Sequence, residues 1–451
     1  MYLPSLFQKV LLGASFTLLM AACSSDSSST TQDGSSVPEA DASGLPAGLK
    51  PGTWRGVLSA QGQEIPFLFD VSTADNGQKP TITLRNGEER LKLDEITTAG
   101  DSTTIRLGVF DAALVVRADG ADKVKGSWVK YDGKEPYRVP FTAGRATSAT
   151  TLFAGDTQKP AVYGDLVKGA TFSVEFRDDE GKTYPAVGII KQDEKNSALL
   201  TGTFLTTTGD YRYLAGNLVT KDGAEHMMLS TFDGSHGFLF DGKLAKPGNI
   251  NAISGDFYSG KSGHETWTAT LDANAKLPDA NALTGMKAGQ KRLDFKFPSI
   301  YEGASISPTD PKYKGKVVVL QILGSWCPNC MDETNFLAPW YEKNKQRGVE
   351  IIGLGYERTP DQALASQKLL KMKQRLNVGY DLAVAGVANK DSASSSLPQL
   401  AKVLAFPTTI FLDKKGEVRK IHTGFSGPGT GKYYQQEVDE FEKTVAGLLA
   451  E

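Results

Sequence analysis

Two cysteines stand close together near the start of the C-terminal third of the chain. Residues 324–330 read Gly-Ser-Trp-Cys-Pro-Asn-Cys and directly follow the apolar run Val317 to Leu323. This order predicts a strand that turns straight into a helix. Cys327 would then lie at the helix N-terminus, where unpaired N–H groups and the helix dipole favour a thiolate, with Cys330 one turn on and within disulfide reach. The spacing therefore predicts thiol–disulfide exchange.

A zinc site and a structural disulfide are the alternatives for this pair. Tetrahedral zinc requires further ligands, and the chain has only one more cysteine, Cys23, and four histidines without ligand spacing, His226, His236, His264 and His422. A disulfide that closes so short a loop removes little entropy from the unfolded chain. We therefore expect redox chemistry, with neither a metal nor another cofactor.

The N-terminus has the layout of an export signal. Lys9 is followed by an apolar stretch, residues 10–22, that is too short to span a bilayer as a helix. Leu19-Met20-Ala21-Ala22-Cys23 resembles a bacterial lipobox, although Met20 departs from the usual pattern. The resemblance implies a signal peptide over residues 1–22 and a lipid on Cys23, and the alternative is plain secretion.

Residues 23–49 are rich in Ser, Thr and Gly, and we interpret them as a flexible tether to the lipid. The predicted location is a bacterial membrane facing the periplasm, with the outer membrane slightly favoured over the inner. A net charge of −2, from 50 basic and 52 acidic residues, gives no indication of nucleic-acid binding.

Residues 50–275 alternate between short apolar runs and turn dipeptides, which predicts an antiparallel all-β region. The dipeptides are Asp119-Gly120, Asp132-Gly133, Glu180-Gly181, Asp222-Gly223, Asp233-Gly234 and Asp241-Gly242. Thr53-Trp54 has an echo in Thr171-Phe172, and residues 124–128 have one in residues 253–257. These echoes suggest two β modules, over residues 50–146 and 147–275.

The pattern changes to alternating strands and helices in the last domain, predicted over residues 285–451. Strands are expected at 317–323, 349–354 and 380–384, helices at about 327–347, 360–376 and 397–404, then a hairpin at 408–422 and a closing helix. In the closing helix Val438, Phe441, Val445 and Leu448 recur at helical spacing. This order predicts an α/β thioredoxin fold at the C-terminus.

Residues 293–450 resemble the TlpA/ResA-type thiol–disulfide oxidoreductases, within the thioredoxin and AhpC/TSA redoxin superfamily. The matching segments are Gly315 to Val319, Trp326 to Cys330 with Glu333, Phe406 to Asp413, and Lys415 to Val418 with Gly424. The resemblance covers about the last third of the chain. It implies protein thiols and disulfides as substrates and a membrane electron donor that restores the site.

The resemblance also implies roles for individual residues. Cys327 becomes the exposed attacking sulfur, Cys330 the resolving sulfur, and Pro407 a cis-proline facing them, with an edge-strand proline as the alternative. Trp326, Phe406 and Thr408 would contact substrate, Phe406 through its backbone. Glu333 resembles the acid that moves protons behind the disulfide, and the alternative is a solvated helix carboxylate.

The sequence leaves open the direction of electron flow and the functional class of the protein. Gln321 stands where thioredoxin has a buried Asp, and the dipeptide Pro328-Asn329 matches neither strongly reducing nor strongly oxidising relatives. One alternative function is a peroxiredoxin-like antioxidant enzyme. Another is a binding lipoprotein whose β modules hold a ligand beside an accessory redox domain, with a surface lined by Trp54, Trp128, Tyr211, Tyr213 and Trp267, although strand aromatics more often lie in the core.

Overall fold

The computed structural model describes residues 48–451 except 74–79, 134, 147–151, 156–162 and 194–197. The predicted signal peptide, Cys23 and nearly all of the predicted tether lie outside the described residues. Among the helices within the described ranges, none combines the length and the apolar character needed to cross a membrane.

The first part of the described chain forms one antiparallel sheet of nine strands, in the order β4-β3-β2-β1-β9-β8-β7-β6-β5. Its strands are β1 (Gly52–Ala60), β2 (Gln63–Ser72), β3 (Thr81–Asn86), β4 (Glu89–Leu93), β5 (Ile96–Ala99), β6 (Ser102–Arg106), β7 (Ala112–Ala118), β8 (Lys123–Lys130) and β9 (Tyr137–Arg145). Alternate residues of β1 and β2 point inward, so Trp54, Phe67 and Phe69 join Trp128 and Phe141 in one buried cluster.

A second nine-stranded sheet follows, in the order β11-β10-β18-β17-β16-β15-β14-β12-β13, and an additional β11–β12 pairing closes it. Its strands are β10 (Ala170–Asp178), β11 (Thr183–Gln192), β12 (Leu200–Thr206), β13 (Gly209–Asp210), β14 (Leu214–Lys221), β15 (Ala224–Phe232), β16 (Gly237–Lys246), β17 (Asn249–Ser259) and β18 (Gly263–Leu271), preceded by the short helix α1 (Gly164–Lys168). Phe176, Phe204, Phe240 and Trp267 fill its interior. The predicted all-β region is therefore confirmed.

The echoed sequences occupy equivalent places in the two sheets. Thr53-Trp54 lies on β1 between β2 and β9, and Thr171-Phe172 lies on β10 between β11 and β18. Residues 124–128 lie on β8 and residues 253–257 on β17, which are two strands away from β1 and β10 in their sheets. The order of strands thus repeats with the sequence. The three tryptophans Trp54, Trp128 and Trp267 are at most 2% exposed, so the idea that they line a surface is wrong.

One predicted turn is also wrong. Asp241-Gly242 lies inside β16 and pairs with β15 and β17 on either side. A Cβ on Gly242 would stand 2.6 Å from the Trp267 ring, so the glycine permits a close approach in the sheet interior and makes no turn.

The C-terminal part contains a five-stranded sheet in the order β23-β22-β21-β24-β25, with β21, β22 and β23 parallel and β24 and β25 antiparallel to their neighbours. Its strands are β21 (Val317–Leu323), β22 (Val349–Glu357), β23 (Asp381–Val387), β24 (Thr408–Leu412) and β25 (Val418–Thr423). The helices are α2 (Pro328–Asn344), α3 (Gln362–Arg375), α4 (Lys390–Ser396) and α5 (Lys432–Ala450). Short elements complete it, the strands β19 (Phe297–Pro298) and β20 (Ser305–Ile306) and the 3₁₀ turns η2 (Lys345–Arg347) and η3 (Pro428–Thr430).

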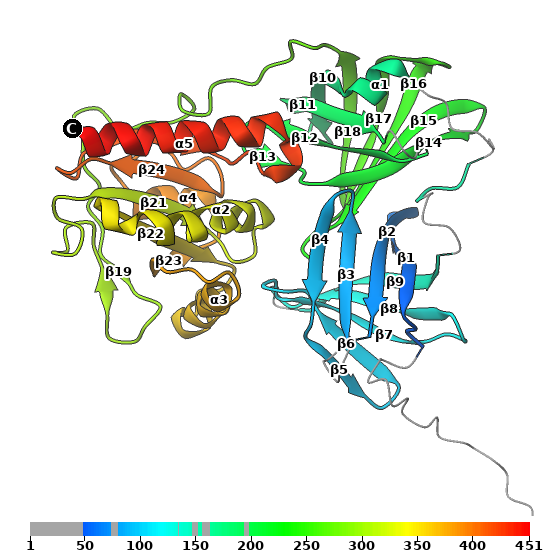
Figure 1. Ribbon diagram of the computed structural model, residues 1–451, viewed down its shortest axis with the longest axis horizontal. Coiled ribbons are helices and arrows are strands. Elements are labelled where there is room, and N and C mark those ends of the chain that lie inside the picture. Colours follow the sequence, from blue (N-terminus) through cyan, green and yellow to red (C-terminus); the bar gives the residue numbers. More distant parts are fainter. Residues whose placement is uncertain (1–47, 74–79, 134, 147–151, 156–162, 194–197) are drawn as a thin grey trace, which may run out of the picture. The chain divides into compact units, whose positions relative to one another are not determined.

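Burial on both faces explains why β21 reads as an unbroken apolar run. Val317, Val319 and Leu323 pack with side chains of α2, α3 and α5. Val318, Leu320 and Ile322 pack on the opposite face, where α4 lies. Figure 1 shows this layered arrangement, with α5 in red at the end of the chain. The thioredoxin fold predicted for the C-terminus is confirmed.

The prediction of a helix over residues 397–404 is wrong, because α4 ends at Ser396, before this range begins. Asn389 caps α4 by accepting the backbone N–H groups of Asp391 and Ser392. Pro398 disfavours helical geometry at Leu397, the residue before it. Leu400 and Val403 are nevertheless buried, so the apolar spacing here reflects a loop packed against the sheet.

Candidate active site

The cysteine pair lies where β21 ends and α2 begins. Cys327 is the N-cap residue of α2, and its Sγ accepts the backbone N–H of Cys330 at 3.4 Å. The Cys327 thiol donates to the carbonyl oxygen of Phe406, also at 3.4 Å. Both cysteines are in the thiol form. Cys330 is fully buried, and burial raises the pKa of its thiol well above the usual value.

The loop before β24 faces the pair. The peptide bond between Phe406 and Pro407 is cis, as the resemblance implied, and Pro407 is buried. The Phe406 ring meets the edge of the Trp326 ring at a centroid distance of 5.6 Å. Thr408 is buried, and its hydroxyl donates to Ala405. The contact between Thr408 and substrate stays a prediction.

Trp326 is held on three sides. Its Nε1–H donates to the carbonyl oxygen of Tyr356 at 2.8 Å, and the Arg358 guanidinium lies 4.5 Å above its ring. With Phe406 on its edge, the ring is fixed beside the cysteine pair and half-buried.

Glu333 lies one turn beyond Cys330 on the inner side of α2 and is only 3% exposed. Its carboxylate accepts hydrogen bonds from Gln321 on β21, at 2.8 Å, and from the Thr409 hydroxyl on β24. Tyr380 and Thr334 hold the Gln321 amide in place. Burial raises the pKa of Glu333 to about 7, against the lowering effect of these hydrogen bonds. The alternative of a solvated helix carboxylate is wrong.

A second buried carboxylate was missed by sequence reasoning. Glu357 ends β22 and accepts hydrogen bonds from both the backbone N–H and the hydroxyl of Ser325, each at 2.8 Å. Burial raises its pKa to about 7. Because β21 and β22 are parallel, their carboxyl ends meet at one edge of the sheet. An acidic residue at the end of an apolar strand was the signal that could have found it.

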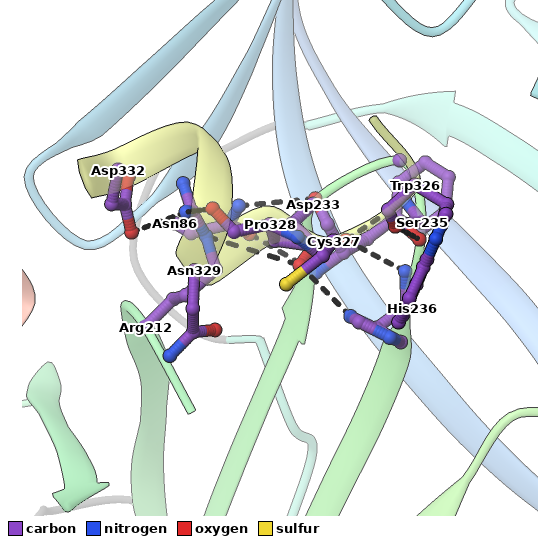
Figure 2. A network of polar contacts seen from close by, with 12 residues as sticks. Asn86, Arg212, Asp233, Ser235, His236, Trp326, Cys327, Pro328, Asn329 and Asp332 are labelled. Carbon is purple, nitrogen blue, oxygen red and sulfur yellow. Dashed lines mark hydrogen bonds and ion pairs between the residues drawn. The ribbon is translucent and has the colours of Figure 1, made fainter. Parts of the chain in front are cut away.

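Arg212 was also missed, and it joins both β sheets to α2. The guanidinium contacts the carboxylates of Glu89 from the first sheet and Asp332 from α2, and its Nε lies 3.9 Å from Asp233. It also donates to the carbonyl oxygen of Pro328 at 2.9 Å, inside the Cys-x-x-Cys segment (Figure 2). All four charged side chains are buried. The contacts of Arg212 with Glu89, Pro328 and Asp332 join residues more than a hundred positions apart, and no spacing in the sequence indicates them.

Further contacts from the second sheet lie around the cysteine pair. The Ser235 hydroxyl donates to the carbonyl oxygen of Trp326 at 3.2 Å, and the Asn329 amide donates to that of Asp210 at 3.1 Å. Figure 2 shows Ser235 and His236 beside Trp326 and Cys327. Cys327 is only 6% exposed. The prediction of an exposed attacking sulfur is therefore corrected: the residue is covered, because the β region contributes the turn that lies against it.

Comparisons with known proteins identify the family of this chain. The Redoxin family model matches residues 287–438. The thiol-disulfide oxidoreductase ResA of Bacillus thuringiensis is 30% identical over 133 residues, which cover 30% of this chain and 68% of that protein. The thiol:disulfide interchange protein DsbE of Escherichia coli is 23% identical over 175 residues, 37% of this chain and 80% of that one. A secreted thiol-disulfide isomerase structure from Corynebacterium glutamicum is 18% identical, with a TM-score of 0.28, covering 39% of this chain and 96% of that one. The chain belongs to the TlpA/ResA-like thiol–disulfide oxidoreductases of the thioredoxin superfamily.

Proposed function

We propose that this oxidoreductase exchanges disulfides with exported protein substrates through Cys327 and Cys330. The observation that carries the proposal is the arrangement at the start of α2, where the Cys327 Sγ sits at the helix N-terminus and a buried carboxylate, Glu333, lies one turn behind Cys330. Family membership gives the reaction class. The residues assigned to each step are inferred from this geometry.

In the direction that reduces a substrate, the Cys327 thiolate attacks one sulfur of the substrate disulfide. A mixed disulfide forms, and the other substrate sulfur leaves and takes up a proton. Cys330 then loses its proton and attacks the Cys327 Sγ, which releases the first substrate sulfur as a thiolate that also takes up a proton. The substrate gains two electrons, the cysteine pair loses two, and oxidation of a substrate dithiol is the reverse.

Deprotonation of Cys330 is the demanding part of this sequence, because burial raises the pKa of its thiol. Glu333 is the base proposed to accept that proton. Its pKa of about 7 lets the carboxylate both take and return a proton near neutral pH. The backbone beside the cis Phe406–Pro407 bond is the proposed place for an extended substrate segment.

The location follows from the N-terminal sequence. Residues 1–22 are the proposed signal peptide, and Cys23 is the proposed site of the lipid that holds the chain at a bacterial membrane facing the periplasm. Each cycle of reduction leaves a disulfide in the site, so a dithiol donor, proposed to be a membrane protein, must reduce it again. Recovery of a Cys23→Ala variant in the membrane fraction to the same extent as wild type would overturn the anchor.

A trapping experiment tests the reaction. We expect Cys330→Ser in the full chain to accumulate a mixed disulfide with a disulfide-bonded substrate protein, because a serine hydroxyl in place of the resolving thiol cannot release it. Cys327→Ser should form none and lose exchange activity. Both are followed on a non-reducing gel, with Ser235→Ala as a variant that keeps both sulfurs. Equal exchange rates in wild type and Cys327→Ser would contradict the assignment.

A further inference from the structure

A small cavity lies behind Glu333, on the side away from the cysteines. Its volume is about 20 Å³, and its polar lining comes from Glu333, Thr409, His422, Glu437 and the Lys420–Glu440 pair. Aromatic and aliphatic side chains of α2, β24 and α5 form the rest of its wall. A space of this size with several polar partners can hold one water molecule.

Strand pairing brings His422 to this cavity. Thr409 on β24 lies directly across from His422 on β25, and the Thr409 hydroxyl donates to the Glu333 carboxylate. The His422 Nε2 lies 2.6 Å from the Glu437 carboxylate on α5, and its Nδ1 lies 2.9 Å from the Asn281 side-chain oxygen. Polar groups of α2, β24, β25 and α5 therefore gather around the small cavity on one face of the sheet.

His422 and Glu437 also border a second cavity. His422 and Glu437 also line a larger cavity of about 500 Å³, together with Asn281, Tyr433 and Gln436. His422 and Glu437 thus line both the small cavity at Glu333 and this larger cavity, which lies between the start of α5 and residues of the second sheet. Their side chains are 13% and 14% exposed, so they have limited contact with solvent.

The charges around His422 suit a group that holds and passes a proton. Burial lowers the pKa of His422, but the Glu437 carboxylate and the nearby Glu333 outweigh burial and raise it. The Glu437 carboxylate raises the pKa of Glu333, and His422 lowers it. Lys420 and Glu440 also face the small cavity and pair with each other at 2.6 Å.

We infer that His422 and Glu437 form the route by which Glu333 exchanges protons with solvent during the reaction. The inference rests on the proposed function, since Glu333 must first take the Cys330 proton. Without an exit, that proton would have to return past the cysteines while they are covered by substrate. His422 does not touch the reacting sulfurs and is a positioning residue for the proton.

The step is a proton transfer and changes no oxidation state. The Cys330 proton moves to the Glu333 carboxylate as Cys330 attacks, which leaves Glu333 neutral. Glu333 passes the proton through the small cavity to His422, and the His422–Glu437 pair releases it to the solvent. The substrate thiolate takes its proton from solvent, so the number of protons balances across the cycle.

The test uses the full chain and the rate of exchange with a disulfide-bonded peptide between pH 5 and pH 9, followed by Trp326 fluorescence. We expect His422→Gln to lower the rate near neutral pH by about tenfold, less than the roughly hundredfold or greater loss from removing the base itself in Glu333→Gln. We also expect the midpoint of its pH profile to move to higher pH, because the group that lowers the pKa of Glu333 is gone.

Glu437→Gln removes the charge that raises the pKa of Glu333, so its midpoint should not move to higher pH. Asp439→Asn, an exposed carboxylate on the same helix, is the matched control and should behave as wild type. Glu437→Asp keeps a carboxylate and should recover part of the rate. Thermal unfolding shows whether each variant folds. If His422→Gln does not fold, Glu437→Gln provides the test.

Two results would overturn the inference. One is a wild-type rate and profile in both His422→Gln and Glu437→Gln. The other is an equal loss of rate at every pH in His422→Gln with an unmoved midpoint, which indicates a purely structural role. If wild type itself exchanges no disulfides, the proposed function fails. If wild type and Glu333→Gln behave as expected while His422→Gln does not, only the proton route fails.

Discussion

Glu333 is a carboxylic acid whose buried environment differs strongly from that of a free side chain. Its folded pKa of about 7 lies above its ordinary value of 4.5, so the folded protein binds a proton that the unfolded chain has lost between these two pH values. Stability therefore falls as pH rises from about 4.5 to about 7. We expect Glu333→Gln to remove this part of the pH dependence, on the order of 3 kcal/mol between pH 5 and pH 8, as measured by urea unfolding.

Glu440→Gln is the control at this scale. The Glu440 carboxylate is exposed and paired with Lys420, and the hydrogen bond from Lys420 contributes to lowering its pKa against the effect of burial. A lowered pKa stabilises the folded protein above the unfolded pKa and loses that effect as pH falls, so this variant cannot flatten the decline. If the stability of Glu333→Gln fell with rising pH as steeply as that of wild type, the Glu333 carboxyl group would not be the buried acid.

At the scale of elements, Gln321 fastens α2 to β21. The side-chain nitrogen of Gln321 donates to Glu333 and Thr334 on the helix, and the side-chain oxygen accepts a hydrogen bond from the Tyr380 hydroxyl. Gln321→Leu leaves these buried groups without that partner. We expect a loss of about 2 to 4 kcal/mol in unfolding free energy, since each unsatisfied buried group costs about 1 to 3 kcal/mol. Because the Gln321 hydrogen bond lowers the pKa of Glu333, the pH profile of exchange should also move to higher pH.

Gln362→Leu provides the comparison, since Gln362 is an exposed residue in the first turn of α3. A change there should stay within about 0.5 kcal/mol. If Gln321→Leu were as stable as Gln362→Leu, the amide would not be the link between strand and helix that its contacts indicate.

At the scale of the whole molecule, Arg212 links the redox site to both β sheets. Arg212→Met leaves Glu89 and Asp332 buried without the guanidinium that contacts them, and Asp233 keeps only His236. Removing one partner of a buried ion pair costs about 3 to 5 kcal/mol. Because Cys327 is covered by contacts from the same region, we expect the variant to react faster with a thiol reagent than wild type. Mass spectrometry of the labelled chain measures this rate.

Arg177→Met is the matched variant, because Arg177 is an exposed arginine paired with Glu175 on the second sheet. Its labelling rate and stability should match wild type, as expected for a surface ion pair. Rapid labelling of Cys327 in wild type, equal to that in Arg212→Met, would mean that the contacts around Arg212 do not control access to the sulfur.

The local sequence was enough to predict the order of strands and helices in the last third of the chain, the Cys-x-x-Cys pair at a helix start, and two repeated β modules. These features depend on periods of two and about four residues and on segments that recur, and both are properties of neighbouring positions. The wrong prediction over residues 397–404 has the same origin, because apolar spacing reports burial, and Pro398 decides the conformation there.

The tertiary structure alone decided what surrounds the cysteines. Glu333 becomes a buried acid because Gln321 and Thr409 come from two different strands, and a turn of the second sheet contacts Trp326 beside the nearly buried Cys327. Arg212, Glu357 and the His422–Glu437 pair lie far from the cysteines in sequence and meet the site only through packing. The chain itself specified the reacting sulfurs, whereas contacts between distant segments set their burial and the route of their protons, because no local pattern records which distant side chains will meet.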